Sequence, residues 1–405
     1  MKTSSASDTN LPLAGIRVLE MGQLIAGPFA GQILAAYGAE VVKIEPPGRG
    51  DPLRTWRELD EKGTSYWWRS IARNKKSVTV DLSRSAGCEI ARELLLKSDV
   101  LIENFRPGRM EAWGLGPETF TGSHPQLIYT RVSGYGQDGP YASKPGFASA
   151  CEAVAGLRYV NGHSGETPVR MNLSLGDSLA GMHAALGVLL ALIARMRPGG
   201  EGQSVDVSIM ESVFNMMEGV LPEYAGAGLV REPSGSTVTG IVPTNTYQCR
   251  DGRYIVIGGN GDSIFQRLMC AVGHPELACD ARLASNQGRV AHESMIDEVL
   301  ESWSQRIDSV EALEVLDAAD VPAGPVNSIA DIVKDEQFKA RSVFEHVDVE
   351  GVSRCVPAMH PKLSAATARN DWAGPELGKH TQEVLQQWLG VDERQVEQWQ
   401  ELRLI

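Results

Sequence analysis

The sequence predicts an α/β protein built on a parallel sheet, with enough chain for two domains. Its 405 residues are sufficient to bury two hydrophobic cores. Near the start of the chain, residues 16–21 read as an apolar strand, residues 29–37 as a helix closed by Gly38, and residues 40–45 as a second strand. A strand–helix–strand unit of this kind indicates a right-handed crossover between parallel strands.

Further apolar segments continue this alternation. We expect strands at 77–82, 100–103, 127–132, 203–209 and 254–258. We expect helices at 87–97, 211–217, 263–272, 294–304 and 310–319, with more helices from Gly378 onward. The run 179–194 has the composition of a buried helix. It is a little short for a membrane span and contains His183, so we expect it inside the protein.

Two segments rich in glycine and proline predict domain boundaries, at 223–240 and at 321–326. We expect residues 1–222 to form the first segment of a large domain and residues 223–240 to form a linker. Residues 241–325 then form a small domain with a glycine-rich loop. Residues 326–405 supply a second linker and C-terminal helices that return to the large domain.

Composition narrows the function classes. The formal net charge of −13 argues against a nucleic-acid partner and against binding to anionic membranes. The six cysteines contain no CxxC pair and read as reduced thiols of a cytoplasmic protein. The eight histidines show no metal-binding spacing, so we expect no metal site. Residues 1–12 are polar and lack an apolar signal region, which predicts a frayed tail.

Asp177 is the first candidate for chemistry. It stands between a glycine turn at Gly176 and the apolar run 179–194, where the first turn of a helix would begin. The helix dipole and the unpaired N–H groups of that turn favour the ionised carboxylate, which is the nucleophilic form. The alternative is that Asp177 is an ordinary helix cap.

Two loops and one arginine are further candidates. Asn104-Phe-Arg-Pro-Gly-Arg109 follows a predicted strand and offers an amide, a stacking face and positive charge for a phosphate. Gly258-Gly-Asn-Gly261 ends another strand and is expected to be a mobile lid whose backbone amides reach a reactive centre. Arg170 could bind the far carboxylate of a dicarboxylic acid. The alternatives are an ordinary turn, a glycine turn and a solvent-exposed arginine.

A dinucleotide site is a weaker prediction. The turn Gly22–Pro28 carries glycine but does not fit G-x-G-x-x-G, although Glu45 stands where a dinucleotide fold places its ribose-binding acid. No Walker loop and no G-x-S-x-G motif occurs in the chain, which disfavours P-loop NTPases and the serine hydrolases of that fold.

An ordered set of short motifs resembles the class III coenzyme A transferases, which include formyl-CoA and carnitine CoA-transferases. The resemblance runs from about Leu13 over nearly the whole chain. The motifs are the Gly22–Pro28 turn, Lys43-Ile-Glu-Pro-Pro-Gly-Arg-Gly-Asp51, Asn74-Lys-Lys-Ser77, Glu103-Asn-Phe-Arg-Pro-Gly108, Gly134-Tyr-Gly136, Leu175-Gly-Asp177, residues 200–207 and Gly258-Gly-Asn-Gly261.

The resemblance implies a fold, an assembly and residue roles. It implies an interlocked homodimer, with a Rossmann-like large domain formed from both chain ends and a smaller α+β domain. Asp177 matches the covalent nucleophile, and Trp56 matches a tryptophan near the acyl pocket. The glycine-rich lid corresponds to Gly258, Gly259 and Gly261. The positions that match the CoA site are Ile25, Ala26, Val80, Asn104, Phe105 and Arg106.

The chain departs from formyl-CoA transferase at several of these places. Pro46 and Ala112 replace arginines that contact CoA, so we expect Arg49, Arg106 or Arg109 to supply the phosphate contacts. Ala148 replaces a glutamate, and the lid carries Asn260 and Asp262 where that enzyme has glycine and glutamine. These changes argue against oxalate as the specific substrate, not against the reaction class.

We therefore interpret the chain as a CoA-transferase that moves CoA from an acyl-CoA to a free carboxylate, with a succinyl-CoA and dicarboxylate exchange favoured. Coenzyme A and acyl-CoA are expected as substrates, with no permanently bound cofactor. One alternative is an α-methylacyl-CoA racemase of the same fold. Family racemases carry a histidine where this chain has the substrate-pocket residue Phe147. The other is a dinucleotide-binding oxidoreductase or a non-catalytic CoA-binding module.

Overall fold

The computed structural model describes residues 11–349 and 351–405, which fall into two compact units. The first unit combines residues up to Leu157 with Met171–Glu218 and Lys339–Ile405. The second combines Arg158–Arg170 with Gly219–Phe338. Each unit is therefore built from more than one stretch of the chain.

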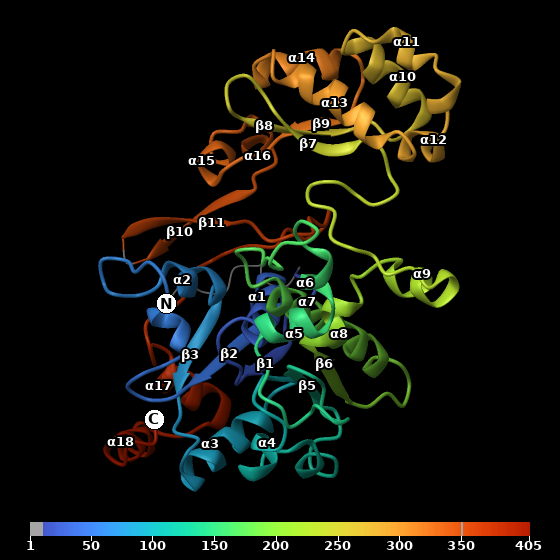
Figure 1. The fold of residues 1–405 in the computed structure, drawn as a ribbon. Helices are drawn as coiled ribbons and strands as arrows, with labels where there is room; N and C mark the ends of the chain where they lie inside the picture. Colours follow the sequence, from blue (N-terminus) through green and yellow to red (C-terminus); the bar gives the residue numbers. More distant parts are fainter. Residues whose placement is uncertain (1–10, 350) are drawn as a thin grey trace. The chain divides into compact units, whose positions relative to one another are not determined.

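A six-stranded parallel sheet forms the centre of the first unit, in the order β3-β2-β1-β4-β5-β6 (Figure 1). The strands are β1 (Arg17–Glu20), β2 (Glu40–Glu45), β3 (Lys75–Thr79), β4 (Val100–Glu103), β5 (Ile128–Ser133) and β6 (Ser204–Ser208). The strand order runs outward in both directions from the β1–β4 pair. That reversal is the topological switch point at which ligands bind in open α/β sheets. The prediction of an α/β fold on a parallel sheet is confirmed.

Helices cover both faces of this sheet. On one face lie α1 (Ala26–Ala36), α5 (Ala148–Val154), α7 (Leu175–Arg195) and α8 (Ile209–Phe214), whose buried side chains form one core cluster with the strands. On the other face lie α3 (Ser85–Leu95), α4 (Arg109–Ala112), η5 (Leu385–Leu389) and α18 (Glu393–Glu401), which form a second cluster. Strands covered on both sides tend to read as apolar runs, which is why β4 is recognisable in the sequence.

Helix α1 and strand β3 are among the elements that begin earlier than the sequence predicted. Helix α1 begins at Ala26, within the Gly22–Pro28 turn, because Pro28 is tolerated in the first turn of a helix. Strand β3 spans Lys75–Thr79 instead of 77–82. The charged Lys75 reads as loop in the sequence, but in the fold its ammonium group is buried beside Glu20.

The rest of the first unit includes an antiparallel hairpin and short helices. Strands β10 (Phe344–Val349) and β11 (Val352–Pro357) form the hairpin. The short elements are η2 (Pro52–Thr55), α2 (Tyr66–Ile71), η3 (Pro117–Thr119) and α17 (Thr381–Val384). Helix α7 is the one helix in the described residues that is long and apolar enough to cross a membrane by length and composition alone. Its buried side packs against α1 and β5.

The second unit has its own core. Strands β7 (Thr244–Gln248), β8 (Tyr254–Gly258) and β9 (Ala323–Pro325) form an antiparallel sheet. Helices α10 (Asp262–Ala271), α13 (Glu293–Ser304) and α14 (Ser309–Ala318) bury their apolar side chains with it. Helix α9 (Val220–Ala227) occupies the start of the glycine-rich stretch. The remaining short elements are α11 (Pro275–Ala278), η4 (Ala281–Leu283), α12 (Asn286–Val290), α15 (Ile329–Ile332) and α16 (Glu336–Ala340). In the sequence, the division between the two units falls within helix α6 (Leu157–Val160).

Candidate active site

A cavity of about 140 Å³ lies beyond the carboxyl ends of the first four strands. It is bordered by residues that follow β1, β2, β3 and β4, so it sits at the switch point of the sheet. Its lining residues are Met21, Gln23, Ile44, Glu45, Pro46, Arg49, Val80, Asp81, Leu82, Ser83, Phe105 and Trp113. Of the residues predicted for CoA, Val80 and Phe105 line this cavity directly.

The turn from Gly22 to Pro28 is held by side chains from several strands. The side-chain amide of Asn104 forms two hydrogen bonds with the backbone of Gln23. The Gln23 N–H donates to Asn104 Oδ1 at 2.7 Å, and Asn104 Nδ2 donates to the Gln23 carbonyl at 2.8 Å. Asp51 accepts the N–H of Leu24, whose φ of 64° is rare outside glycine and asparagine. Ile25 and Ala26 follow directly and are buried. The predicted CoA-site turn therefore has a fixed shape.

A buried set of four charges lies beneath this turn. Lys43 contacts Glu20 at 3.0 Å and Asp51 at 2.9 Å, and it donates to the Gly22 carbonyl at 2.6 Å. Lys75 contacts Glu20 at 2.7 Å and donates to the Pro28 carbonyl at 2.5 Å. Lys43 thus binds the Gly22 end of the turn, and Lys75 binds the Pro28 end. Because two acids offset two bases, the set is neutral overall.

Burial and charge act together on these groups. Burial lowers the pKa of Lys75 to about 8, although Glu20 opposes the shift. Burial alone would raise the pKa of Glu20, but the ammonium groups of Lys75 and Lys43 bring it below its usual range. Burial disfavours the charged form of Lys43 as well, yet Asp51 and Glu20 outweigh it and raise the pKa of that ammonium group.

The loop after β4 places aromatic and basic groups beside the cavity. Phe105 meets Trp113 edge to face, with ring centroids 5.0 Å apart. The guanidinium of Arg109 lies 5.5 Å from the Trp113 ring centroid, and Arg106 donates to the Ser143 carbonyl. Both arginines are exposed. Arg49 also lines the cavity and is exposed, whereas Pro46 in the same lining brings no charge.

Glu45 has no capacity left for a ribose. Its Oε1 accepts from Arg54 at 2.8 Å and from Ser77 at 2.6 Å. Its Oε2 accepts from Arg54 at 2.7 Å and from the Asp51 N–H at 3.0 Å. A dinucleotide fold needs this acid free to bind hydroxyl groups. The acid that kept the dinucleotide alternative open therefore has a structural role.

Asp177 lies in the first turn of α7, as the sequence predicted, and is partly exposed. The residue before it, Gly176, is buried against α5 and α8. A Cβ at Gly176 would lie 3.2 Å from both Glu152 Cγ and Ile209 Cγ2. Glycine at 176 thus lets the start of α7 approach its neighbours closely, which fixes where the Asp177 carboxylate emerges.

Two buried side chains of α5 adjoin this turn. Glu152 accepts the Gly176 N–H at 3.0 Å and so satisfies one of the unpaired amides at the start of α7. Cys151 donates its thiol to the Gly134 carbonyl at 3.2 Å. Burial raises the pKa of the Cys151 thiol to about 11, and the charges of Asp177 and Glu152 add to the shift. Cys151 is therefore protonated at neutral pH, which makes it a poor nucleophile.

The glycine-rich loop belongs to the second unit, between β8 and α10. The fully buried Arg289 donates to the Asn260 carbonyl at 2.6 Å and to Asp262 at 2.8 Å. A Cβ at Gly259 would lie 2.5 Å from Leu268 Cδ2, so glycine is required there for packing, whereas Gly258 is open. The N–H groups of Asn260 and Gly261 donate to no acceptor within the described residues.

The remaining predicted residues are distributed over both units. Trp56 and Phe147 belong to the first unit, with exposed side chains, and Phe147 precedes α5. Arg170 is exposed and belongs to the second unit. In the first unit, the fold joins Ala26 to the helix that carries Asp177, because a Cβ at Gly181 of α7 would lie 2.7 Å from the Ala26 carbonyl oxygen.

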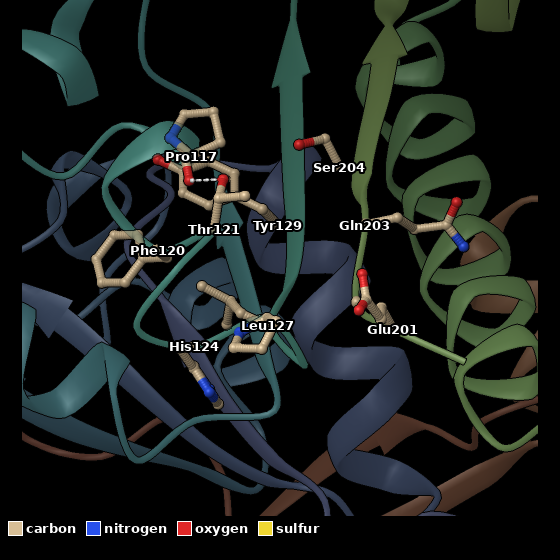
Figure 2. Close-up of a pocket in the computed structure, with 11 residues that line it drawn as sticks. Pro117, Phe120, Thr121, His124, Leu127, Tyr129, Glu201, Gln203 and Ser204 are labelled. Carbon is tan, nitrogen blue, oxygen red and sulfur yellow. Dashed lines mark hydrogen bonds between the residues drawn. The ribbon is translucent and has the colours of Figure 1, made fainter. Parts of the chain in front are cut away.

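A second cavity of about 140 Å³ lies at the amino ends of strands β5 and β6, whereas the first lies beyond the carboxyl ends of strands (Figure 2). His124 bonds the Ser98 carbonyl there, and the Tyr129 hydroxyl donates to the Leu115 carbonyl, so both groups already have partners. The described residues contain no group of three His, Cys, Asp or Glu arranged to hold a metal ion.

Sequence reasoning missed several residues that shape the site. Lys43 and Asp51 lie within a motif that carried the resemblance, but their burial has no local signal. For Glu152 and Arg289, the sequence gives no local signal that the side chain binds backbone groups. Each becomes informative only when the fold shows its backbone partners.

The Rossmann-like sheet, the cavity at its switch point and the acid in the first turn of a core helix define an α/β enzyme. The chain matches the family model of CoA-transferase family III over residues 13–381, and it belongs to that family. The succinyl-CoA–D-citramalate CoA-transferase of Chloroflexus aurantiacus is 43% identical over 395 residues, covering 97% of this chain and 98% of that protein.

Other relatives agree. The human succinyl-CoA:glutarate CoA-transferase is 30% identical over 389 residues, covering 95% of this chain and 88% of that protein. The crystal structure of a CAIB/BAIF family protein from Brucella suis superimposes with a TM-score of 0.83 at 32% identity, covering 94% of this chain and all of that one. The predicted family and reaction class, a CoA-transferase acting on acyl-CoA and carboxylate, are confirmed.

Proposed function

We propose that this enzyme moves CoA from succinyl-CoA to a dicarboxylic acid through covalent intermediates on Asp177. The observation that carries the proposal is the place of Asp177, in the first turn of the 21-residue helix α7. The helix dipole favours the ionised carboxylate there. The substrate class is supported by relatives named for succinyl-CoA with citramalate, malate and glutarate.

In the first half of the reaction, a carboxylate oxygen of Asp177 attacks the thioester carbonyl of succinyl-CoA. The carbon–sulfur bond breaks, and CoA thiolate leaves with the electron pair. A mixed anhydride of Asp177 and succinate remains. The thiolate then attacks the aspartyl carbonyl, which releases succinate and leaves an aspartyl-CoA thioester. No proton needs to move in these steps, so the chemistry requires no general base.

The second half reverses these steps with a new acid. The acceptor carboxylate attacks the aspartyl thioester and expels the thiolate, forming a second anhydride. The thiolate attacks the acceptor carbonyl, which gives the new acyl-CoA and restores Asp177. We assign to the glycine-rich loop, Gly258, Gly259 and Gly261 with Asn260, the stabilisation of the oxyanions. The support is that the N–H groups of Asn260 and Gly261 have no acceptor within the described residues.

The nucleotide part of CoA is assigned to the cavity beyond β1 to β4. Phe105 and Trp113 offer aromatic surface for a base, Val80 an apolar wall, and Arg49 a charge for phosphate. Arg106 and Arg109 on the adjoining loop add positive charge. Ile25, Ala26 and Asn104 belong to this site through the rigid turn after β1.

The decisive experiment traps the covalent intermediate. Purified protein is mixed with succinyl-CoA and hydroxylamine, which converts an activated carboxylate to a hydroxamate. Mass spectrometry should locate the modification on Asp177. Asp177→Asn should lose at least about 10³-fold in transfer rate while it folds normally, because a neutral amide can still sit in the first helical turn but cannot act as the nucleophile.

Asp138→Ala is the matched control, since Asp138 is an exposed acid of the same unit. It should transfer CoA at the wild-type rate. Turnover of Asp177→Asn near that of wild type would reduce Asp177 to a helix cap.

We further propose a homodimer in the cytoplasm, interlocked as the resemblance implies, with the two units as its two domains. Helix α7 carries a stripe of apolar side chains, each more than half exposed: Met182, Leu186, Leu190 and Ile193. A contiguous apolar stripe of this kind is typical of an interface. Leu186→Glu combined with Leu190→Glu should halve the mass measured by light scattering. A wild-type monomer would contradict the proposal.

A further inference from the structure

Arg57 is an exposed cation held against an aromatic ring. Its guanidinium lies 4.0 Å from the ring centroid of Trp67, and Trp56 lies 6.4 Å from the same ring. Trp56 is 44% exposed although tryptophan is among the most apolar side chains. Together Trp56, Arg57 and Trp67 form a solvent-facing platform, the Trp–Arg platform.

Arg57 forms no ion pair or hydrogen bond with another described residue, although acids surround it in the sequence. Asp60 is bound by Arg69 at 2.9 Å, and Glu61 is bound by Arg354. These two nearby acids are therefore engaged by other arginines. A guanidinium that is stacked but unpaired has its N–H edges available for an external carboxylate.

The loop that carries Arg57 is rigid. Arg57 has a φ of 58°, a left-handed conformation that costs energy for a residue with a side chain. The conformation is maintained by anchors on both sides. Asp60 accepts the Thr64 N–H at 2.9 Å, and Tyr66 N–H donates to the Glu58 carbonyl at 3.1 Å. Arg57 is thus positioned before any ligand arrives, which lowers the entropy lost on binding.

The platform and Asp177 flank the same turn. Trp67 packs against the cluster that contains Ile25, alongside Leu24 and Phe29. Gly181, one helical turn after Asp177 on the same face of α7, meets that end of α1, because its Cβ would lie 3.0 Å from Phe29 Cβ. Phe29 therefore lies between the helix of the nucleophile and the cluster beneath Trp67.

We propose that Arg57 binds the far carboxylate of a dicarboxylic acyl group while Trp56 and Trp67 cover its methylene chain. The inference rests on the proposed function, since it names the residue that selects dicarboxylic over monocarboxylic substrates. A planar guanidinium supplies a bidentate contact to carboxylate, and two indole rings supply apolar surface for the carbons between the carboxylates.

The test compares succinyl-CoA with butyryl-CoA, which differ in the far carboxylate. Hydroxamate formation with each donor is followed for wild type, Arg57→Met and Arg57→Lys. The ratio of kcat/KM for succinyl-CoA over butyryl-CoA should fall ~10–100-fold in Arg57→Met, as for loss of a hydrogen bond to a charged group. Arg57→Lys should restore part of the ratio, because lysine keeps the charge but not the bidentate contact.

The control is Arg92→Met, an arginine on the surface of α3 that pairs with its neighbour Glu93, and it should leave the ratio unchanged. An unchanged ratio in Arg57→Met, or equal losses with both donors, overturns the inference while the proposed function stands. A change of ratio in Arg170→Met instead of Arg57→Met also overturns it. Wild-type protein that forms hydroxamate with neither donor overturns the proposed function itself.

Discussion

Asn104 gives the sharpest test of the proposal that the Gly22–Pro28 turn belongs to the CoA site. In Asn104→Ala the Gln23 N–H and carbonyl lose their partners at 2.7 and 2.8 Å. Two net hydrogen bonds of about 1 kcal/mol each predict a loss of about 2 kcal/mol in the free energy of unfolding. If roughly 1.4 kcal/mol of that loss is felt by the bound state through the loosened turn, the Kd for CoA rises about tenfold.

Calorimetric titration with CoA and urea unfolding measure the two effects. Asn286→Ala is the matched control, because Asn286 makes the same two-sided contact in the second unit, accepting from the Val242 N–H and donating to the Gly240 carbonyl. It should lose similar stability but bind CoA as tightly as wild type. The reasoning fails if Asn104→Ala binds CoA normally, or if both variants weaken binding equally.

Three further predictions test separate parts of the site. Arg49→Gln should raise the KM for succinyl-CoA about tenfold and leave the KM for the dephospho analogue unchanged, if Arg49 contacts the 3′-phosphate; equal KM changes would contradict that contact. Between pH 8 and 10.5 the unfolded chain binds more protons at Lys75 than the folded chain does. The free energy of unfolding should therefore rise with pH through that window, by about 1 kcal/mol per pH unit. In urea unfolding, the Lys75→Met variant should not show that rise. A pH profile parallel to that of the wild type would refute the prediction. Because Phe147 cannot accept a proton, the enzyme should not exchange the α-proton of a 2-methylacyl-CoA for solvent deuterium. Fast deuterium incorporation in the absence of an acceptor acid would favour the racemase alternative.

The sequence predicted the elements whose signal is local. Strands β2 and β4 match the predicted bounds, because both are rich in β-branched residues and lie between turns. The start of β3 could not be predicted, since a lysine enters a buried strand only if a distant acid, here Glu20, neutralises it. The hairpin β10–β11 was missed because its residues alternate with charges and bury little.

Some residues of the candidate site could likewise be predicted from the sequence, and others could not. Asp177 could be placed at the N-terminus of α7 from the glycine turn and the apolar run alone. Arg57 could not be singled out from the sequence, because the ring on which it stacks, Trp67, is ten positions away in helix α2. Its lack of an ion pair also depends on which acids other arginines bind. The reaction class could be predicted from the ordered motifs, whereas the role proposed for Arg57 rests on contacts that only the fold shows.

The second face of the sheet has a consequence for biosynthesis. The core there is completed by Leu385, Trp388, Val396 and Leu404, and the Leu404 carbonyl accepts the Asp81 N–H at the end of β3. The six strands are all synthesised by Ser208. At about 5–20 residues per second, the ribosome delivers the covering segment roughly 10–40 s later. During that interval α3 and α4 cover only part of this face, and the apolar surface that the C-terminal segment will bury stays exposed. A chaperone that binds such surfaces would hold the chain until translation supplies the rest of the cover.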